Sequence, residues 1–183
     1  SLVAERRRFL IFHIEKVKMS TFSPSDNSSF DVGHARIAIV VARWNAKITE
    51  NLLIGARHGL TDYGIAEKNI DLFRVPGAFE LPLACQKLAQ KSIYDGIIVL
   101  GCVIRGGTPH FEYICGETTR GIGQVTLQES LPIGFGLLTT NDLEQSELRS
   151  GVIFNDSENE NKGKEAALTV LEMISLFSKL GSL

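Results

Sequence analysis

Four short apolar runs, each followed by a segment with helical spacing, constrain this chain more than any other feature. The first run, residues 36–42, is almost wholly β-branched, as expected of a strand covered on both faces in a parallel sheet. Similar runs occupy residues 70–75, 96–103 and 132–139. Strands that alternate with helices form right-handed βαβ units. The pattern therefore predicts a three-layer α/β/α fold around a four-stranded parallel sheet.

The segments between these runs carry the signals of helices. Residues 46–63 repeat apolar side chains at helical spacing, and Gly64 is well placed to end that helix. Pro82 fits the first turn of a helix that runs to about residue 89, and Asp142 can cap a short helix that runs to about residue 149. Longer helices are expected over residues 110–130 and 164–180. In the last of these we expect the inward side chains to be Ala167, Val170, Leu171, Ile174 and Leu176.

The length of 183 residues suits one well-packed domain and is short for two. Because we find no repeat or linker, residues 35–183 are expected to form a single domain. Residues 1–34 are expected to be a polar N-terminal extension, partly disordered, with Met19 as a candidate natural start. The basic and apolar residues near position 10 do not form a signal peptide, since charged residues interrupt the apolar run.

Charge and cysteine content limit the classes of partner. The formal net charge of -2 gives no basic field for nucleic acid or for an anionic membrane surface, and no apolar run approaches the roughly 20 residues of a membrane span. Cys85, Cys102 and Cys115 fall in a predicted helix, strand and helix, without the spacing of zinc ligands. We expect free thiols, no metal site and a cytoplasmic protein.

In a parallel sheet, ligands bind beyond the carboxyl ends of the strands. Four segments should meet there: Trp44, residues 78–80, residues 105–110 and residues 139–140. Trp44 either packs in the core or stacks on a flat heterocycle. Glu80 lies in the first turn of a helix, where either the helix dipole or a ligand hydroxyl accounts for a carboxylate, so both readings remain open.

The loop at residues 105–110 suits an anion. Residues 101–108 nearly match the nucleotide P-loop GxxxxGK[ST], but Gly107 stands where the lysine must be, which argues against a nucleoside triphosphatase. The amides of Gly107 and Thr108, with the Thr108 hydroxyl, suit a single phosphate monoester. The alternative is an ordinary turn in which the glycines supply permissive backbone. His110 begins the next helix, either as a polar cap or as a residue that takes or gives a proton near neutral pH.

Four motifs together resemble the 6,7-dimethyl-8-ribityllumazine synthase family: VPGAFELP (75–82), LGCVIRGGTPHFEYI (100–114), FGLLTTNDLEQ (135–145) and NKGKEAA (161–167). The resemblance covers about residues 35–176 in the family's order. It implies a flavodoxin-like fold and the penultimate step of riboflavin biosynthesis. In that step 5-amino-6-(D-ribitylamino)uracil condenses with 3,4-dihydroxy-2-butanone 4-phosphate to give 6,7-dimethyl-8-ribityllumazine, phosphate and water, without a metal or organic cofactor.

The resemblance also implies roles for individual residues. His110 matches the proton-transfer residue and Arg149 the arginine that pairs with phosphate. Trp44 matches the aromatic residue that stacks on the pyrimidine, and Gly107 and Thr108 match the phosphate cradle. Further substrate-binding positions are matched by Ala78, Phe79 and Glu80 for the ribityl chain, by Cys102, Val103 and Ile104 for the pyrimidine, and by Phe135 and Lys162.

In the family the site lies between neighbouring subunits of a pentamer, and Phe135 and Arg149 would face the other residues across that interface. Residues 150–161 are longer and more acidic than the link typical of capsid-forming members, which favours a free pentamer over a 60-subunit shell. The competing interpretation is a non-catalytic flavin- or lumazine-binding protein on the same scaffold, because a fold alone does not establish a function.

Overall fold

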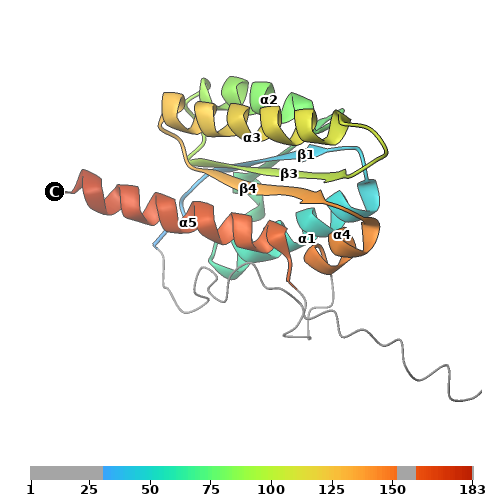
Figure 1. Cartoon of the computed structure of the whole chain (residues 1–183). Coiled ribbons are helices and arrows are strands. Elements are labelled where there is room, and N and C mark those ends of the chain that lie inside the picture. The colour runs from blue at the N-terminus through green and yellow to red at the C-terminus, as the bar shows by residue number, and fades with distance from the viewer. Residues whose placement is uncertain (1–30, 152–159, 183) are drawn as a thin grey trace, which may run out of the picture.

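Four parallel strands form the centre of the molecule (Figure 1). The computed structural model describes residues 31–151 and 160–182. The strands are β1 (Ile37–Ala42), β2 (Ile70–Val75), β3 (Gly96–Ile104) and β4 (Ile133–Thr140), in the order β2-β1-β3-β4. Each begins at the first residue of a predicted run or one residue later. The predicted four-stranded parallel sheet is confirmed.

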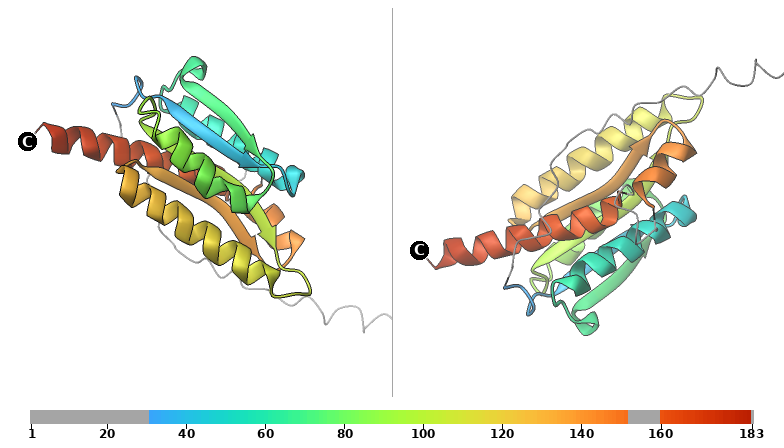
Figure 2. Two further views of the ribbon diagram at one scale, coloured as in Figure 1. Left: turned by 90° about the horizontal axis from the view of Figure 1, so that it is seen from above. Right: turned by 90° about the horizontal axis from the view of Figure 1, so that it is seen from below.

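Helices cover both faces of this sheet, as the two views of Figure 2 show. One face carries α1 (Ala46–Asp62), α5 (Lys162–Gly181) and the short α4 (Leu143–Arg149). The other carries α2 (Leu81–Ala89) and α3 (His110–Glu129). Two short 3-10 helices, η1 (Glu67–Asn69) and η2 (Ala78–Glu80), lie before β2 and before α2 in the chain. The prediction of a three-layer, flavodoxin-like α/β/α fold is therefore confirmed.

Each face of the sheet has its own apolar core. Every residue of β1 is buried, as are the first seven of β3, because both strands lie between helices.

The α1 and α5 helices approach closely through glycines. A Cβ atom on Gly163 would lie 2.0 Å from the Leu52 carbonyl oxygen, and one on Gly55 would lie 2.0 Å from Asn161 Oδ1. The start of α5 is thus fixed against the middle of α1.

The ends of the helices follow local sequence signals. Gly64 has a φ of 85°, which suits glycine at the end of α1, and Pro82 lies in the first turn of α2, as predicted. The Asp142 side chain accepts a hydrogen bond from the Gln145 amide at 2.8 Å, which confirms the predicted cap of α4. The α5 helix starts two residues before the predicted position, because the Asn161 side chain caps it.

One predicted core residue is wrong. Leu176 is 44% exposed, whereas Ala167, Val170, Leu171 and Ile174 are buried as predicted. Leu176 follows Ala167 by nine residues, which at 3.6 residues per turn places it on the opposite side of α5, away from the sheet, while the last turns of this helix extend past the sheet (Figure 1).

The predictions for the amino end concern mostly residues outside the described part of the chain. Residues 1–30, including the candidate start Met19, lie outside them. Within residues 31–34, Val32 is fully buried and belongs to the core on the α1 and α5 face. The boundary placed before residue 35 and the disorder of the extension remain predictions. The three cysteines are free thiols as predicted, with Cys85 and Cys102 buried and Cys115 partly buried.

Candidate functional site

The strand order creates a topological switch point at the carboxyl edge of the sheet, the place where open α/β sheets have their ligand crevice. The chain leaves β1 for α1 on one face and leaves β3 for α3 on the other, although β1 and β3 are neighbours. Ligands of open α/β sheets bind at such a switch point, beyond the carboxyl ends of the strands. The segments that follow β1, β2, β3 and β4 all start at this edge, because the four strands are parallel.

Trp44 lies at this edge on the surface of the chain. It is 73% exposed, so the alternative of a core tryptophan is wrong. The next residue, Asn45, has left-handed backbone with a φ of 57°, and its Nδ2 donates to the Cys102 carbonyl at 2.9 Å. This hydrogen bond joins the turn after β1 to the end of β3. An exposed tryptophan on a braced turn presents a flat apolar ring at the crevice.

Glu80 lies beside that ring. Its Oε2 accepts a hydrogen bond from the Gly77 amide at 2.8 Å. A Cβ atom on Gly77 would lie 3.2 Å from both Glu80 Oε2 and Trp44 Cδ1, so the absence of a side chain at Gly77 leaves room for the carboxylate and the ring on either side of it. Glu80 thus has a local role in the turn, and Oε1 makes no hydrogen bond with the described residues. Ala78 is buried under this turn, whereas Phe79 is 58% exposed.

The loop after β3 has glycines that the local backbone does not require. Among the described residues only Gly64 is a glycine with positive φ, so Gly106 and Gly107 do not serve left-handed backbone. A Cβ atom at either position would meet no other atom within 4 Å. Thr108 is exposed, and its hydroxyl makes no hydrogen bond with the described residues. Without side chains at these two glycines, a ligand could approach the backbone of the loop closely.

His110 is the first residue of α3 and is exposed. The position before it is held by Pro109, and no side chain caps this helix. The alternative of His110 as a capping residue is therefore wrong. Its imidazole makes no hydrogen bond with the described part of the chain, which leaves both ring nitrogens available to a ligand in the crevice.

Arg105 braces the loop, a role that the sequence analysis did not assign. Its Nε donates to Asn141 Oδ1 at 3.0 Å, its backbone N–H donates to the Thr140 carbonyl at 2.9 Å, and its guanidinium pairs with Glu112. The hydrogen bond from Arg105 lowers the pKa of Glu112 below its ordinary value. The guanidinium also lies 4.2 Å from the centre of the Phe111 ring. Arg105 therefore joins the end of β4 to the first turn of α3.

The end of β3, which is expected to line a pyrimidine pocket, is buried at Cys102 and half-buried beyond it. Cys102 is 3% exposed and its carbonyl already accepts the Asn45 hydrogen bond, whereas Val103 and Ile104 are half-buried at the end of β3. Burial raises the pKa of the Cys102 thiol, although a hydrogen bond with Ser146 opposes this. Cys102 therefore contributes support for the site rather than a reactive group.

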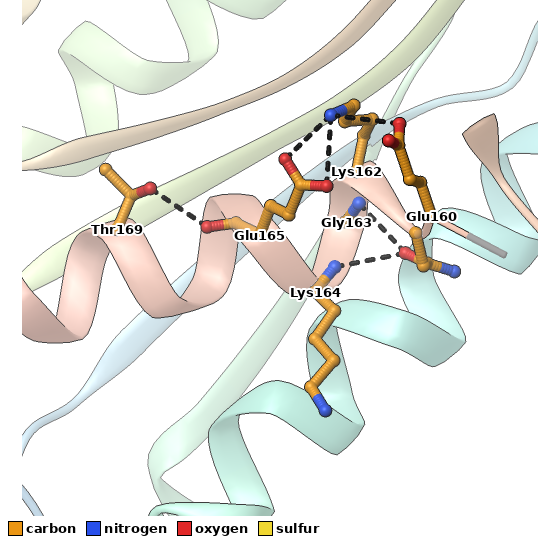
Figure 3. Close-up of polar contacts among 7 residues, drawn as sticks. Glu160, Lys162, Gly163, Lys164, Glu165 and Thr169 are labelled. Carbon is orange, nitrogen blue, oxygen red and sulfur yellow. Dashed lines mark hydrogen bonds and ion pairs between the residues drawn. The ribbon is translucent and has the colours of Figure 1, made fainter. Parts of the chain in front are cut away.

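Two cations lie on separate helices. Arg149 is the last residue of α4 and its Nη1 donates to the Gln145 carbonyl at 3.2 Å. Lys162 begins α5, where its ammonium lies 2.8 Å from Glu165 and 3.4 Å from Glu160 (Figure 3). Burial alone would lower the pKa of Lys162, yet the two carboxylates raise it overall. Lys162 thus has local partners that a bound anion would have to displace or share.

Phe135 is the one expected site residue that the single chain keeps away from this edge. It pairs with Val99 near the start of β4, five residues before Thr140. At about 3.3 Å per residue, that places it roughly 17 Å from the carboxyl end of the strand. Phe135 is 44% exposed on an edge strand, so it is available to a neighbouring molecule.

A model of the 6,7-dimethyl-8-ribityllumazine synthase family matches residues 34–178 of the chain. The match includes every segment of the crevice described above. Within the described residues, no helix is both long enough and apolar enough to cross a membrane. The same part of the chain holds no group of three or more histidine, cysteine or acidic side chains that could bind a metal ion.

Proposed function

The chain belongs to the 6,7-dimethyl-8-ribityllumazine synthase family, a family of transferases in riboflavin biosynthesis, and we propose that it forms the lumazine at the crevice beyond β1 and β3. The proposed substrates are 5-amino-6-(D-ribitylamino)uracil and 3,4-dihydroxy-2-butanone 4-phosphate. The products are 6,7-dimethyl-8-ribityllumazine, one phosphate and two waters, and the chemistry needs no metal or organic cofactor.

The observation that carries this proposal is that Trp44 and Glu80 both lie close to Gly77, at the carboxyl edge of the sheet. A flat ring beside a carboxylate suits a pyrimidine that bears a polyhydroxylated chain. The ring would stack on the pyrimidine, and the unused Glu80 oxygen would accept a hydrogen bond from a ribityl hydroxyl. Ala78 and Phe79 would bind the same chain. Val103 and Ile104, with Cys102 beneath them, would border the pyrimidine.

The phosphate of the second substrate would bind at the loop after β3. The free space above Gly107 and the unused hydroxyl of Thr108 support this placement. Arg149 would pair with the phosphate oxygens, since a guanidinium can bind them bidentately. Lys162 would add a second positive charge only if the phosphate shares it with Glu160 and Glu165.

The reaction needs modest acid and base strength. The amine of the uracil attacks the ketone of the butanone, and loss of one water gives an imine. Phosphate then leaves, and ring closure loses the second water. Holding both substrates in one crevice supplies much of the acceleration. His110 would move protons as the imine forms and phosphate departs, and Arg149 would stabilise the departing dianion.

Part of the site would come from a second copy of the chain. Phe135 cannot reach the crevice of its own chain, yet the family resemblance matches it to a position of the site. In a homo-oligomer, Phe135 and Arg149 of one chain would face Trp44 and His110 of its neighbour, so both chains would complete one site.

We favour a free pentamer over a 60-subunit shell, because residues 150–161 are long and acidic, although residues 152–159 lie outside the described structure. Sedimentation should give the mass of five chains, and a near-megadalton particle would contradict this. A cytoplasmic location is part of the same proposal.

The test is a one-pot reaction of the purified chain with both substrates. Lumazine, followed by its absorbance, and free phosphate should form in equal molar amounts, and neither should form when one substrate is omitted. Binding of the lumazine without its formation would instead support the non-catalytic binding protein.

A further inference from the structure

Three buried polar side chains meet between β3, β4 and α4. The Ser146 hydroxyl lies 2.6 Å from Thr140 Oγ1 and 3.3 Å from Cys102 Sγ. Ser146 is 0% exposed, and Thr140 and Cys102 are each 3% exposed. We call these three residues the polar junction. It joins the carboxyl ends of two strands to the helix that carries Arg149.

The side chains of the polar junction are buried, and they are hydrogen-bonded to one another. Buried polar groups weaken a core unless they are hydrogen-bonded, and here each member has a partner in the junction. The arrangement is therefore specific: a hydroxyl at position 146 fits only while α4 keeps its place relative to both strands. A purely apolar contact would tolerate sliding of α4 along the strands, because dispersion forces are not directional.

The α4 helix has particular need of such a restraint. It has only seven residues, and a helix of that length is not stable by itself. Its first turn is held by the Asp142 cap, and its last residues continue into Ser150, whose hydroxyl donates to the Ser146 carbonyl at 2.8 Å. Ser146 is thus at the centre of the helix's attachment, one turn before Arg149.

We propose that the polar junction sets the position of Arg149, with Ser146 and Thr140 as positioning residues for phosphate recognition. Neither side chain would touch substrate, because both are buried under the crevice. The inference rests on the proposed function, in which Arg149 binds the phosphate of the butanone. A small shift of α4 would move the guanidinium away from that phosphate while leaving Trp44 and the pyrimidine side unchanged.

The experiment compares Ser146→Ala and Thr140→Val with Thr140→Ser. The alanine and valine variants remove a hydroxyl from the junction, and valine keeps the shape of threonine. Loss of one buried hydrogen bond should raise KM for the butanone phosphate about threefold to tenfold and should leave KM for the aminouracil near the wild-type value. Thr140→Ser keeps the hydroxyl and should behave like wild type. Ser175→Ala, a buried serine far along α5, controls for loss of a buried hydroxyl elsewhere.

A second readout does not depend on turnover. Affinity for inorganic phosphate, measured by calorimetry, should fall in Ser146→Ala and Thr140→Val by a similar factor and remain in Thr140→Ser and Ser175→Ala. If Ser146→Ala does not fold, the Thr140→Val and Thr140→Ser pair decides the question. Unchanged phosphate affinity, or an equal rise in both KM values, would overturn the positioning role. Weakened phosphate binding in a chain that forms no lumazine would support the junction and refute the proposed function.

Discussion

Replacing Asn161 should lower the free energy of unfolding through two separate losses, the cap of α5 and a hydrogen bond to α1. Asn161 Oδ1 accepts hydrogen bonds from the Gly163 and Lys164 amides at 2.9 Å and 3.0 Å, which caps α5. Its Nδ2 donates to the Asn51 carbonyl of α1 at 3.0 Å. Loss of the cap costs about 1 kcal/mol. Loss of the second contact costs about another 1 kcal/mol. Asn161→Ala should therefore lower the free energy of unfolding by about 2 kcal/mol.

The matched variant Asn161→Asp separates the two contributions. A carboxylate keeps the cap acceptor and suits the positive end of the helix dipole, but it cannot donate to the Asn51 carbonyl. The expected loss is about 1 kcal/mol, half that of alanine. Asn69→Ala is the control, since the Asn69 side chain makes no hydrogen bond with the described residues, and it should stay within about 0.5 kcal/mol of wild type.

Urea unfolding and calorimetry at matched protein concentration measure these differences, because association of copies adds to the apparent stability. For a chain of this size, 2 kcal/mol corresponds to a fall in Tm of about 4–8 °C. An Asn161→Ala variant as stable as Asn69→Ala would show that the contacts at the start of α5 contribute nothing. Equal losses for alanine and aspartate would show that the cap is irrelevant.

The remaining predictions concern catalysis and pH. His110→Ala should slow turnover moderately, about 10²-fold as for loss of a general acid or base, with little change in KM, measured by initial rates of lumazine formation. Arg149→Ala should strongly weaken use of the butanone phosphate, and unchanged kinetics in both variants would refute the assigned roles. At the other end of the sheet, the hydrogen bond from Arg36 lowers the pKa of Asp71 below its ordinary value of 3.8, against the opposing effect of burial. This carboxylate should therefore contribute stability above about pH 4 that is lost as the pH falls through its folded pKa, so the difference in unfolding free energy between wild type and Asp71→Asn should shrink below pH 4.

The strands and helices could be predicted because their signals are local. Burial on both faces makes β1 continuously apolar, and helical spacing identifies α1 and α3 within a residue or two at each end. Leu176 shows the limit of that reasoning. It lies nine residues after Ala167 and so on the opposite side of α5, which shows that an apolar residue in a helix need not belong to its inward face.

The edge of the site could also be predicted, since parallel strands bring their carboxyl ends together. The contacts within it could not. Trp44 and Glu80 both lie close to Gly77, where a side chain would crowd them, and Arg105 reaches Asn141 across 36 residues of sequence. The polar junction has the same origin, because a serine in a short helix gives no sign of which strand it will face.

The contribution of a second chain could not be derived from periodicity at all. Phe135 lies in the first half of a strand, away from the edge where ligands bind, and only the family resemblance selects it. Its exposure on an edge strand leaves it available to a neighbour, but single exposed apolar side chains are common and identify no partner.

The most direct test of a site shared between chains is a complementation measurement with two variants. Trp44→Ala removes the ring of one side and Phe135→Ala removes the ring of the other, and each variant alone should form lumazine slowly. When the two chains are co-expressed with different tags and hybrid oligomers are purified, some sites combine an intact Trp44 with a neighbour's intact Phe135. Random mixing in a ring should restore about a quarter of wild-type activity, because each site needs the right chain on both sides. Hybrid activity no greater than the average of the two variants would contradict a site shared between neighbouring chains.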